Sequence, residues 1–502
     1  MNNTIIGSVF ENSDRIGPKP AVITGNTVVT YRELRQKIIS ARNFLNSINI
    51  KRGDRIVLEA SFSPFFVYGY LATHLIGAVA VPVDPKIPLE RLTYILEKVQ
   101  PVAVFSERKF SQESFRIYGI DVFDLKYGID DDHDLLNPLP EDNADILFTT
   151  GTTGDPKGVV LTHRNIISAA KNINTFIKNT EEDLEVVPLP LSHSFGLGRL
   201  RCNLLMGGTI VMVDGFSYIG RFIKAIEQQK ATGFSTVPTG IAMLFRMTKD
   251  KIKDFADQLK YIEIGSAPMP LEHKKKLMEL LPHTRICMHY GLTEASRSTF
   301  IEFHESAEKI EHSIGKPTPN VQVKIVDKDF NDLPVGEKGR IAVKGDMTLK
   351  EYYKDVELTN EIIKNSFIDT GDIGFQDEDG YFYLDAREKE MINVGGIKVS
   401  PIEIEKLLVK HPSVKECACI GIPDPDGIMG EVVKAYLLHN KKIPEKPHVR
   451  ELSAFLNGKI EPYKIPAKIE WIESIPKTTS GKIQRILLKQ SIQGANISGS
   501  NK

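Results

Sequence analysis

The densest group of phosphate-binding residue types lies in the segment DILFTTGTTGDPKGVVLTHRNI, residues 145–166. Glycines let backbone N–H groups approach phosphate oxygens, threonine hydroxyls add donors, and a lysine adds positive charge. The residues are Thr149, Thr150, Gly151, Thr152, Thr153, Gly154 and Lys157. It is not a Walker A loop, because Lys157 is not flanked by Gly before it and Ser or Thr after it. We therefore predict a phosphate loop; the alternative is an exposed polar turn.

Further motifs follow in a fixed order along the chain. They are VPLPLSHSFGLG at 187–198, GSAPMP at 265–270, HYGLTEA at 289–295, DTGDIG at 369–374, YLDAREKEMINVGGIKVSPIEIE at 383–405 and PKTTSGKIQR at 476–485. Together with the phosphate segment they resemble the adenylate-forming superfamily: acyl- and aryl-CoA ligases, peptide-synthetase adenylation domains and beetle luciferases. The resemblance covers nearly the whole chain, and several ordered matches are more specific than any single motif.

The resemblance implies an AMP-forming acid–thiol ligase of the acyl-CoA synthetase type. Such an enzyme uses ATP and Mg²⁺ to convert a carboxylic acid to acyl-AMP and pyrophosphate. It then transfers the acyl group to coenzyme A and releases AMP. Catalysis in the first step depends on positioning and charge neutralisation. The acceptor is expected to be coenzyme A, with the phosphopantetheine of an acyl carrier protein as the alternative.

The resemblance also assigns roles to single residues. Glu294 is expected to hold Mg²⁺, for which oxygen ligands are suited, and Asp372 to accept hydrogen bonds from the ribose hydroxyls. Lys482 is expected to reach the reacting carboxylate and α-phosphate, where a cation lowers the barrier. Tyr290 would pack against adenine. Taken alone, these residues would be a surface charge, a turn residue, an exposed loop lysine and a core tyrosine.

The remaining roles complete the predicted site. The resemblance implies that the catalytic residues are Lys482, Thr293, Glu294 and His193. Besides the phosphate loop, the predicted nucleotide contacts are Gly265, Ser266, Ala267, Pro268, Tyr290, Gly291, Asp372, Arg387 and Lys482. Lys389 falls at the hinge position, about which the small domain of this family rotates between the two half-reactions. A structural role for His193 is an open alternative.

The acid itself is only partly constrained by the sequence. The predicted substrate pocket consists of His193, Phe195, Gly196, Leu197, Val237 and Gly265. These residue types favour an uncharged or apolar acyl group. Relatives that activate amino acids place an aspartate near SHSFGLGRL, and this chain has no acid there. Arg199, Arg201 and Arg297 would either meet a second anionic group or be paired with acids in the structure; the second reading is favoured.

Two rival functions remain open at this stage. A protein of the same fold could bind nucleotides without catalysis, but every catalytic position carries the expected residue type. A luciferase-like oxidation shares the adenylation step and would need a special acid. Pyrophosphate release from ATP with a panel of acids separates the first rival from an enzyme.

The elements that must position these residues alternate between apolar strands and amphipathic helices. TYRELRQKIISARNFLNSI and PLERLTYILEKV predict helices, and DRIVLEA and PVAVFSE predict strands. This alternation indicates an α/β fold with a large N-terminal domain of mainly parallel sheets. Residues 320–345 predict a β-rich subdomain, and the C-terminal part predicts a small, mobile α+β domain. We expect domains at 1–388 and 389–502, with a disordered tail.

Composition limits the partners. The chain has 502 residues and a formal net charge of -1, so neither nucleic acid nor an anionic membrane is an expected partner. The first residues lack a basic start and a long apolar core, so no signal peptide is expected. The apolar stretch from Pro64 to Val83 is read as a buried helix and strand rather than a membrane span. Four cysteines in a chain this long indicate buried thiols and a cytoplasmic location. HKKK at 273–276 is read as a solvated helix face.

Overall fold

The computed structural model describes residues 3–108, 115–124, 138–150, 156–216, 218–387, 390–394, 397–425, 431–460, 462–478 and 481–490. Contacts divide the chain into two compact units. The first unit is Met1–Val323 with Val343–Ile368, and the second is Lys324–Ala342 with Asp369–Lys502. The functional division at residue 388 stays a prediction, since contacts alone do not test which segments act together.

The first sheet of the first unit has the strand order β18-β8-β7-β4-β3-β5-β6. Strands β7, β4, β3, β5 and β6 are parallel, whereas β8 and then β18 run antiparallel to their neighbours. The bounds are β3 (Arg55–Glu59), β4 (Val79–Val83), β5 (Ala103–Phe105), β6 (Arg116–Tyr118), β7 (Asn143–Thr150), β8 (Pro156–Thr162) and β18 (Glu351–Tyr352).

The second sheet of this unit runs in the order β15-β14-β13-β12-β11-β9-β10-β1-β2. From β13 to β1 the strands are parallel, whereas β2 pairs antiparallel with β1, β14 with β13, and β15 with β14. The bounds are β1 (Pro20–Thr24), β2 (Thr27–Thr30), β9 (Leu184–Val187), β10 (Thr209–Met212), β11 (Gly233–Thr236), β12 (Tyr261–Ile264), β13 (Arg285–Tyr290), β14 (Thr299–Glu302) and β15 (Ser313–Pro317). The predicted α/β architecture with mainly parallel sheets is confirmed.

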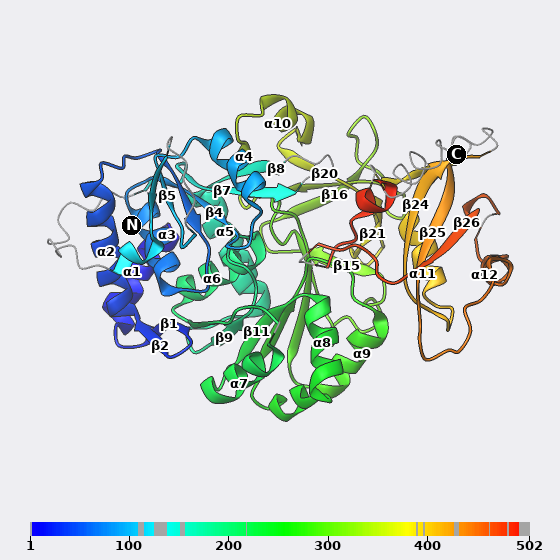
Figure 1. Ribbon diagram of the computed structural model, residues 1–502, viewed down its shortest axis with the longest axis horizontal. Helices are drawn as coiled ribbons and strands as arrows, with labels where there is room; N and C mark the ends of the chain where they lie inside the picture. Colours follow the sequence, from blue (N-terminus) through cyan, green and yellow to red (C-terminus); the bar gives the residue numbers. More distant parts are fainter. Residues whose placement is uncertain are drawn as a thin grey trace, which may run out of the picture. The chain divides into compact units, whose positions relative to one another are not determined.

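Helices cover these sheets (Figure 1). They are α1 (Ile5–Ile16), α2 (Tyr31–Ser47), α3 (Pro64–Leu75), α4 (Leu89–Val99), α5 (His163–Ile177), α6 (Ser194–Met206), α7 (Ile219–Gln229), α8 (Pro238–Thr248), α9 (Leu271–Leu280) and α10 (Val356–Ile362), with 3-10 turns η1 (Ile120–Asp124) and η3 (Lys251–Phe255) and the short strand β19 (Ile363–Lys364). Thr162 caps α5 through a reciprocal capping box with Asn165. The helix therefore begins directly after β8, as the sequence predicted.

The apolar stretch from Pro64 to Val83 is a helix and a strand inside the first unit. Helix α3 buries nearly its whole surface, and every residue of β4 is buried. No helix in the described ranges is long and apolar enough to cross a membrane. The interpretation as a core helix and core strand is confirmed.

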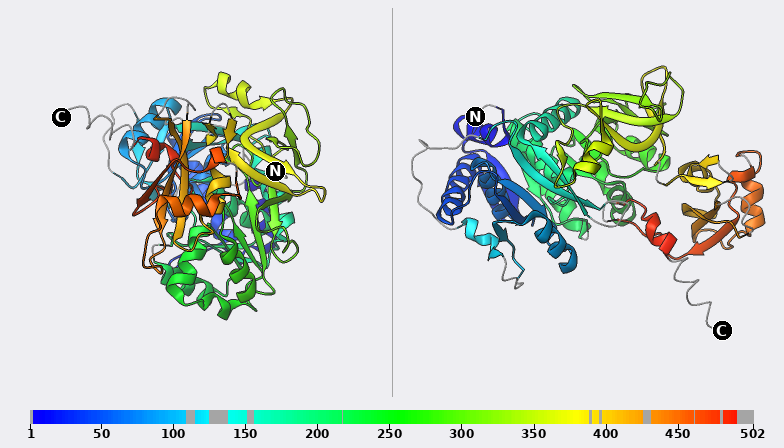
Figure 2. Two further views of the ribbon diagram at one scale, coloured as in Figure 1. Left: turned by 90° about the vertical axis from the view of Figure 1, so that its right-hand side faces the viewer. Right: turned by 90° about the horizontal axis from the view of Figure 1, so that it is seen from above.

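The second unit combines a β-rich part with a small α+β part. Strands β16 (Gln322–Val326), β17 (Gly339–Lys344), β20 (Phe367–Gln376) and β21 (Phe382–Arg387) are neighbours in that order. After them come β22 (Ile392–Val394), β23 (Ile397–Val399), α11 (Pro401–Leu408), β24 (Val414–Pro423), β25 (Glu431–His439), α12 (Val449–Leu456), η5 (Pro462–Lys464) and β26 (Lys468–Ile472). In both views of Figure 2 the gold-to-red strands and helices gather in one compact group.

All four cysteines are buried free thiols. Cys202 and Cys287 belong to the first unit, and Cys417 and Cys419 to the second. The last two lie on one face of β24 with their sulfur atoms 3.8 Å apart. The prediction of ordinary buried cysteines is confirmed.

One surface prediction is wrong. Lys274 in the HKKK segment is only 4% exposed. Its ammonium donates a hydrogen bond to the Ile310 carbonyl and lies 5.8 Å from the centre of the Phe303 ring. Lys274 is three residues before Leu277, so the two share the buried face of α9.

Candidate active site

The phosphate-loop segment joins the two strands of a β-hairpin. Strands β7 and β8 pair antiparallel, with Thr149 opposite Lys157 and Thr150 opposite Pro156. Residues 151–155, which include Gly151, Thr152, Thr153 and Gly154, lie outside the described residues, as does the side chain of Thr150. The hairpin fixes the backbone at both ends of this segment.

Lys157 and Glu294 both meet Tyr352. The ammonium of Lys157 lies 5.8 Å from the centre of the Tyr352 ring. The Tyr352 hydroxyl donates a hydrogen bond to Glu294 Oε1 at 2.6 Å. Tyr352 belongs to β18, where it lies opposite Val159 of β8. The cation of the phosphate segment and the predicted metal ligand are therefore brought together by one tyrosine.

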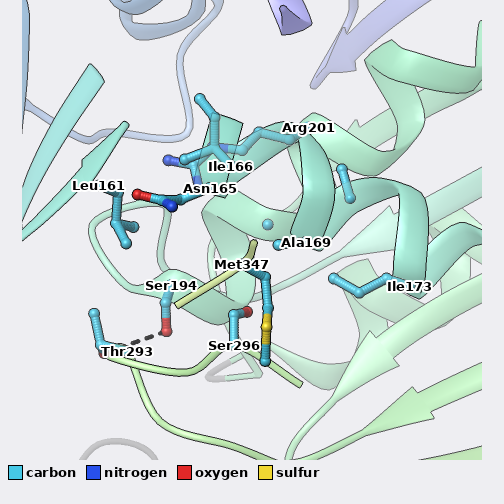
Figure 3. Close-up of a pocket in the computed structure, with 12 residues that line it drawn as sticks. Leu161, Asn165, Ile166, Ala169, Ile173, Ser194, Arg201, Thr293, Ser296 and Met347 are labelled. Atoms are coloured by element: carbon cyan, nitrogen blue, oxygen red, sulfur yellow. Dashed lines mark hydrogen bonds between the residues drawn. The ribbon is translucent and has the colours of Figure 1, made fainter. Parts of the chain in front are cut away.

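The turn that carries Thr293 and Glu294 is held by backbone contacts. The Leu349 N–H donates to the Glu294 carbonyl at 2.8 Å, and the Leu292 N–H donates to the Ala295 carbonyl at 3.0 Å. Figure 3 shows Thr293 beside Ser194, whose hydroxyl oxygen lies 3.4 Å from that of Thr293. These oxygens are donors and acceptors suited to a phosphate or a hydrated cation.

A cavity of about 20 Å³ lies behind this pair, between α5, α6 and the segment that carries Met347 (Figure 3). It has room for about one water molecule. Ser194, Thr293 and Ser296 supply hydroxyl groups to its wall, and Arg201 supplies a guanidinium. The cavity is too small for a substrate, so we assign it to local packing.

The predicted acid-pocket residues surround the start of α6. His193 is the N-cap residue and is exposed. Phe195 is 7% exposed, whereas Leu197 is fully buried in the core. Gly196 packs so closely that a Cβ there would lie 2.4 Å from the Pro190 carbonyl oxygen. Of this part of the predicted pocket, His193 is exposed and Phe195 is almost completely buried.

The predicted adenine turn follows β12 directly. A Cβ added to Gly265 would lie 2.1 Å from the His289 ring, so only glycine fits there without movement. Ser266 has φ 77°, a left-handed conformation that is uncommon outside glycine. Ala267 and Pro268 continue this turn, and Val237 precedes α8. Such backbone outliers often mark ligand-binding turns.

Tyr290 and Gly291 end β13 at a tight approach to the following loop. Tyr290 is half-buried. A Cβ added to Gly291 would lie 2.5 Å from the Arg297 backbone nitrogen. Arg297 itself has φ 51° and is 3% exposed. The glycine therefore lets the chain fold back so that Thr293 and Glu294 form the tip of the turn.

A cluster of buried charged residues around Glu263 packs against Phe195 through Arg297. Glu263 lies 3.1 Å from both Arg199 and Arg297, and 2.8 Å from the His289 imidazole. Burial alone would raise the pKa of the Glu263 carboxyl, but Arg297 and Arg199 outweigh burial and hold that pKa well below its usual range. Arg199 also pairs with Glu185, at 2.8 Å from its Nε. The carboxylate is thus ionised in the folded protein.

Arg201 belongs to a second buried group. Its guanidinium contacts the Asp145 carboxylate, and only 5% of the Arg201 side chain is exposed. The Tyr70 hydroxyl lies 2.9 Å from Arg201 Nε, and His74 Nε2 lies 3.1 Å from Asp145. Arg199, Arg201 and Arg297 are therefore all paired with buried carboxylates, which confirms the second of the two interpretations.

The second unit carries the remaining predicted residues. Asp372 is 1% exposed, and its N–H donates to the Thr370 hydroxyl at 3.2 Å. In the β20–β21 ladder Asp372 lies opposite Arg387, whose side chain is outside the description. Lys389 lies outside the described residues altogether.

Lys482 is exposed in a closed turn. Its N–H donates to the Thr478 hydroxyl at 3.1 Å, and its carbonyl accepts from the Thr478 N–H at 2.8 Å. Arg485, three residues later, binds Glu390 at 2.6 Å and Glu405 at 2.7 Å. The turn is therefore fastened to the body of the small α+β part.

Sequence reasoning missed four residues of this arrangement: Ser194, Glu263, His289 and Tyr352. Glu263 had a signal, since YIEI places one acid inside an otherwise apolar buried strand. Such an acid needs a buried cation. Tyr352 in EYYKD had no comparable signal, because its partner Glu294 is remote in sequence.

The residues present fit Mg²⁺. Glu294, Thr293 and Ser194 supply oxygen atoms, which hard cations prefer. Within the described ranges no cluster of three or more His, Cys, Asp or Glu residues could hold a metal. Mg²⁺ commonly binds through one or two carboxylates together with substrate phosphates, so a single glutamate suffices.

Comparison with known proteins gives matches along almost the whole chain. The family description "AMP-binding enzyme" matches residues 9–353, and "AMP-binding enzyme C-terminal domain" matches residues 403–482. A feruloyl-CoA synthase from Amycolatopsis is 30% identical, with 96% of this chain and 98% of that protein covered.

Solved structures agree. The o-succinylbenzoate CoA synthetase of Bacillus subtilis with its acyl-adenylate intermediate has a TM-score of 0.85 at 26% identity, covering 96% of this chain and 97% of that one. The same enzyme with ATP and a magnesium ion also has a TM-score of 0.85 at 26% identity, covering 96% and 99%.

Proposed function

The chain belongs to the family of AMP-binding enzymes, and from this premise we propose which of its residues carry each half-reaction. It is an ATP-dependent ligase that joins a carboxylic acid to coenzyme A through acyl-AMP. One observation supports the assignment of residues above all. Lys157 lies over the Tyr352 ring and Glu294 accepts a hydrogen bond from the Tyr352 hydroxyl, so one tyrosine contacts both groups beside the β7–β8 hairpin.

In the first half-reaction a carboxylate oxygen attacks the α-phosphorus of ATP, and the bond to the leaving pyrophosphate breaks. We propose that Thr149, Lys157 and the segment between them bind the phosphates. Lys482 supplies positive charge where negative charge develops. Asp372 and Arg387 hold the ribose, and Tyr290 with the 265–268 turn holds the adenine. These groups position the reactants and neutralise charge rather than exchange protons.

Glu294 is the proposed ligand of Mg²⁺, with Thr293 and Ser194 as neighbouring oxygen donors. The bound ion would neutralise phosphate charge when it is present. ATP and Mg²⁺ are the cofactor set that the family membership supports. Tyr352 keeps the Glu294 carboxylate in place from the side of β18.

In the second half-reaction a thiolate attacks the acyl carbon, the carbon–oxygen bond to AMP breaks, and AMP leaves. Coenzyme A is this thiol, in keeping with the feruloyl-CoA synthase relative. The phosphopantetheine of an acyl carrier protein is a second acceptor to be tested beside it. A cytoplasmic location is part of the proposal and is supported by the four free thiols.

We propose that the acid is a monocarboxylate with an uncharged body. Beneath Phe195, the buried charges of Arg199 and Arg297 are met by Glu185 and Glu263. An arginine already paired with a buried carboxylate has little to gain from a second anion. The residues proposed to line the pocket, His193, Phe195 and Val237, add no acid that would bind an amino group.

The test is a panel of acids mixed with ATP, Mg²⁺ and either coenzyme A or a carrier protein, read by mass spectrometry for acyl-AMP and thioester. Aromatic and aliphatic monocarboxylates should give both products, and dicarboxylates and amino acids should give little. Preference for a dicarboxylate would contradict the pocket assignment. Pyrophosphate release with none of the acids would instead favour a non-catalytic nucleotide-binding protein.

A further inference from the structure

Tyr352 contacts both Lys157 and Glu294, the two groups proposed to act on the ATP phosphates and their metal ion. None of the sequence motifs described above includes Tyr352. Tyr352 is 7% exposed. The hydroxyl donates to Glu294 Oε1 at 2.6 Å, and the ring lies 5.8 Å from the Lys157 ammonium. A buried hydroxyl on an ionised carboxylate makes a stronger bond than a neutral pair.

The backbone around Tyr352 joins the same two parts. Tyr352 lies opposite Val159, two residues after Lys157, in the β18–β8 ladder. The neighbouring Tyr353 N–H donates to the Gly158 carbonyl at 2.7 Å. On the other side, the Leu349 N–H donates to the Glu294 carbonyl at 2.8 Å. Residues 349–353 therefore tie the exit of the phosphate segment to the turn that carries Glu294.

The tyrosine is a dependable donor. The Tyr352 hydroxyl is the donor in this bond, because a carboxylate oxygen can only accept. A glutamate side chain has several rotamers, and a hydrogen bond to one carboxylate oxygen selects among them. The second oxygen then has a defined position before any ion binds, which is what preorganisation of a ligand means.

We propose that Tyr352 is a positioning residue that holds Glu294 in the rotamer that binds the metal and keeps it near Lys157. This rests on the proposed role of Glu294 as the Mg²⁺ ligand. Tyr352 itself touches neither ion nor substrate in this proposal. Removing a hydrogen-bond partner of a metal ligand typically costs 10–100-fold in metal affinity.

Metal binding can be measured without turnover. Mn²⁺ replaces Mg²⁺, α,β-methylene-ATP replaces ATP, and electron paramagnetic resonance reports free Mn²⁺. The variants are Tyr352→Phe, Glu294→Gln and the double variant. Tyr353→Phe is the matched control, because it removes the hydroxyl of the next residue along the strand, which lies 3.4 Å from the Val99 carbonyl instead. Melting curves accompany every variant.

Tyr352→Phe should raise the Mn²⁺ dissociation constant about 10-fold, and Tyr353→Phe should leave it within twofold. In the Glu294→Gln background, Tyr352→Phe should add little, because the two act through one carboxylate. Mn²⁺ titrations that stay unchanged in Tyr352→Phe, or equal effects with and without Glu294, would overturn the proposal for Tyr352. A Glu294→Gln protein that binds Mn²⁺ as tightly as the parent would overturn the proposed role of Glu294 itself.

Discussion

At the scale of single residues, Lys482 is the group whose proposed role is easiest to isolate. It is exposed on a turn closed by Thr478, so truncating its side chain leaves the fold intact. We expect Lys482→Ala to slow acyl-AMP formation by about 10²–10³, the usual effect of one oriented charge at a transition state. Thioester formation from supplied acyl-AMP should continue. Equal losses in the two separate assays would refute a role confined to the first half-reaction.

His163 makes the stability of the protein depend on pH. It is fully buried, and burial first and His74 next lower its pKa from 6.5 to about 3. Below pH 6.5 the unfolded chain binds a proton that the folded chain does not, so stability falls as pH falls. Between pH 7 and pH 5 the loss should be about 2 kcal/mol, because the slope approaches roughly 1.4 kcal/mol per unit below pH 6.5.

The check is His163→Phe, which keeps a ring against His74, 4.9 Å away between centroids. Urea unfolding of parent and variant from pH 7 to pH 5 should give a flatter pH dependence for the variant. Contributions from other groups, such as His289, whose pKa burial also lowers, are common to both proteins. Parallel curves would show that His163 does not titrate differently in the two states.

At the scale of elements, the close approach of β12 and β13 depends on one glycine. A Cβ at Gly265 would meet the His289 ring, which Glu263 and Phe195 hold in place. We expect Gly265→Ala to destabilise the protein by about 1–3 kcal/mol through overpacking and to raise the KM for ATP.

The control is Gly220→Ala in α7, where a Cβ would meet nothing within 4 Å among the described residues. Alanine is the better helix former there, so thermal stability should stay the same or rise. Thermal melts and ATP titrations of both variants decide the matter. A Gly265→Ala protein with unchanged melting temperature and KM would mean that the His289 ring moves aside freely.

The same scale shows what sequence reasoning could predict. The helix at Tyr31–Ser47 and the hairpin with its following helix were predictable, because periodicity, capping residues and turns are local signals. The pairing of Tyr352 with Glu294 was not, since it depends on β18 joining the edge of β8. The prediction that Lys274 is exposed was wrong. In a run of charged residues the sequence does not indicate which one lies on the same buried face of α9 as Leu277.

At the scale of the whole molecule, the family resemblance predicts two arrangements that alternate about Lys389. A hinge residue must change its backbone dihedrals, whereas proline fixes φ near -65°. We expect Lys389→Pro to slow one half-reaction, thioester formation, far more than the other. Pyrophosphate exchange and thioester formation from supplied acyl-AMP are measured separately, with a melting curve as control. Parallel losses in both assays would leave the hinge unsupported.

The distribution of the four cysteines has an experimental consequence. Cys202 and Cys287 are buried in one unit, and Cys417 and Cys419 are buried in the other. A thiol reagent therefore reaches each cysteine only when the surrounding part of the protein opens. Burial raises the pKa of Cys202 to about 11, which slows its reaction further. Labelling followed by peptide mapping would thus measure the opening free energy of each unit separately. A ligand that stabilises one unit would delay labelling of that unit's cysteines alone.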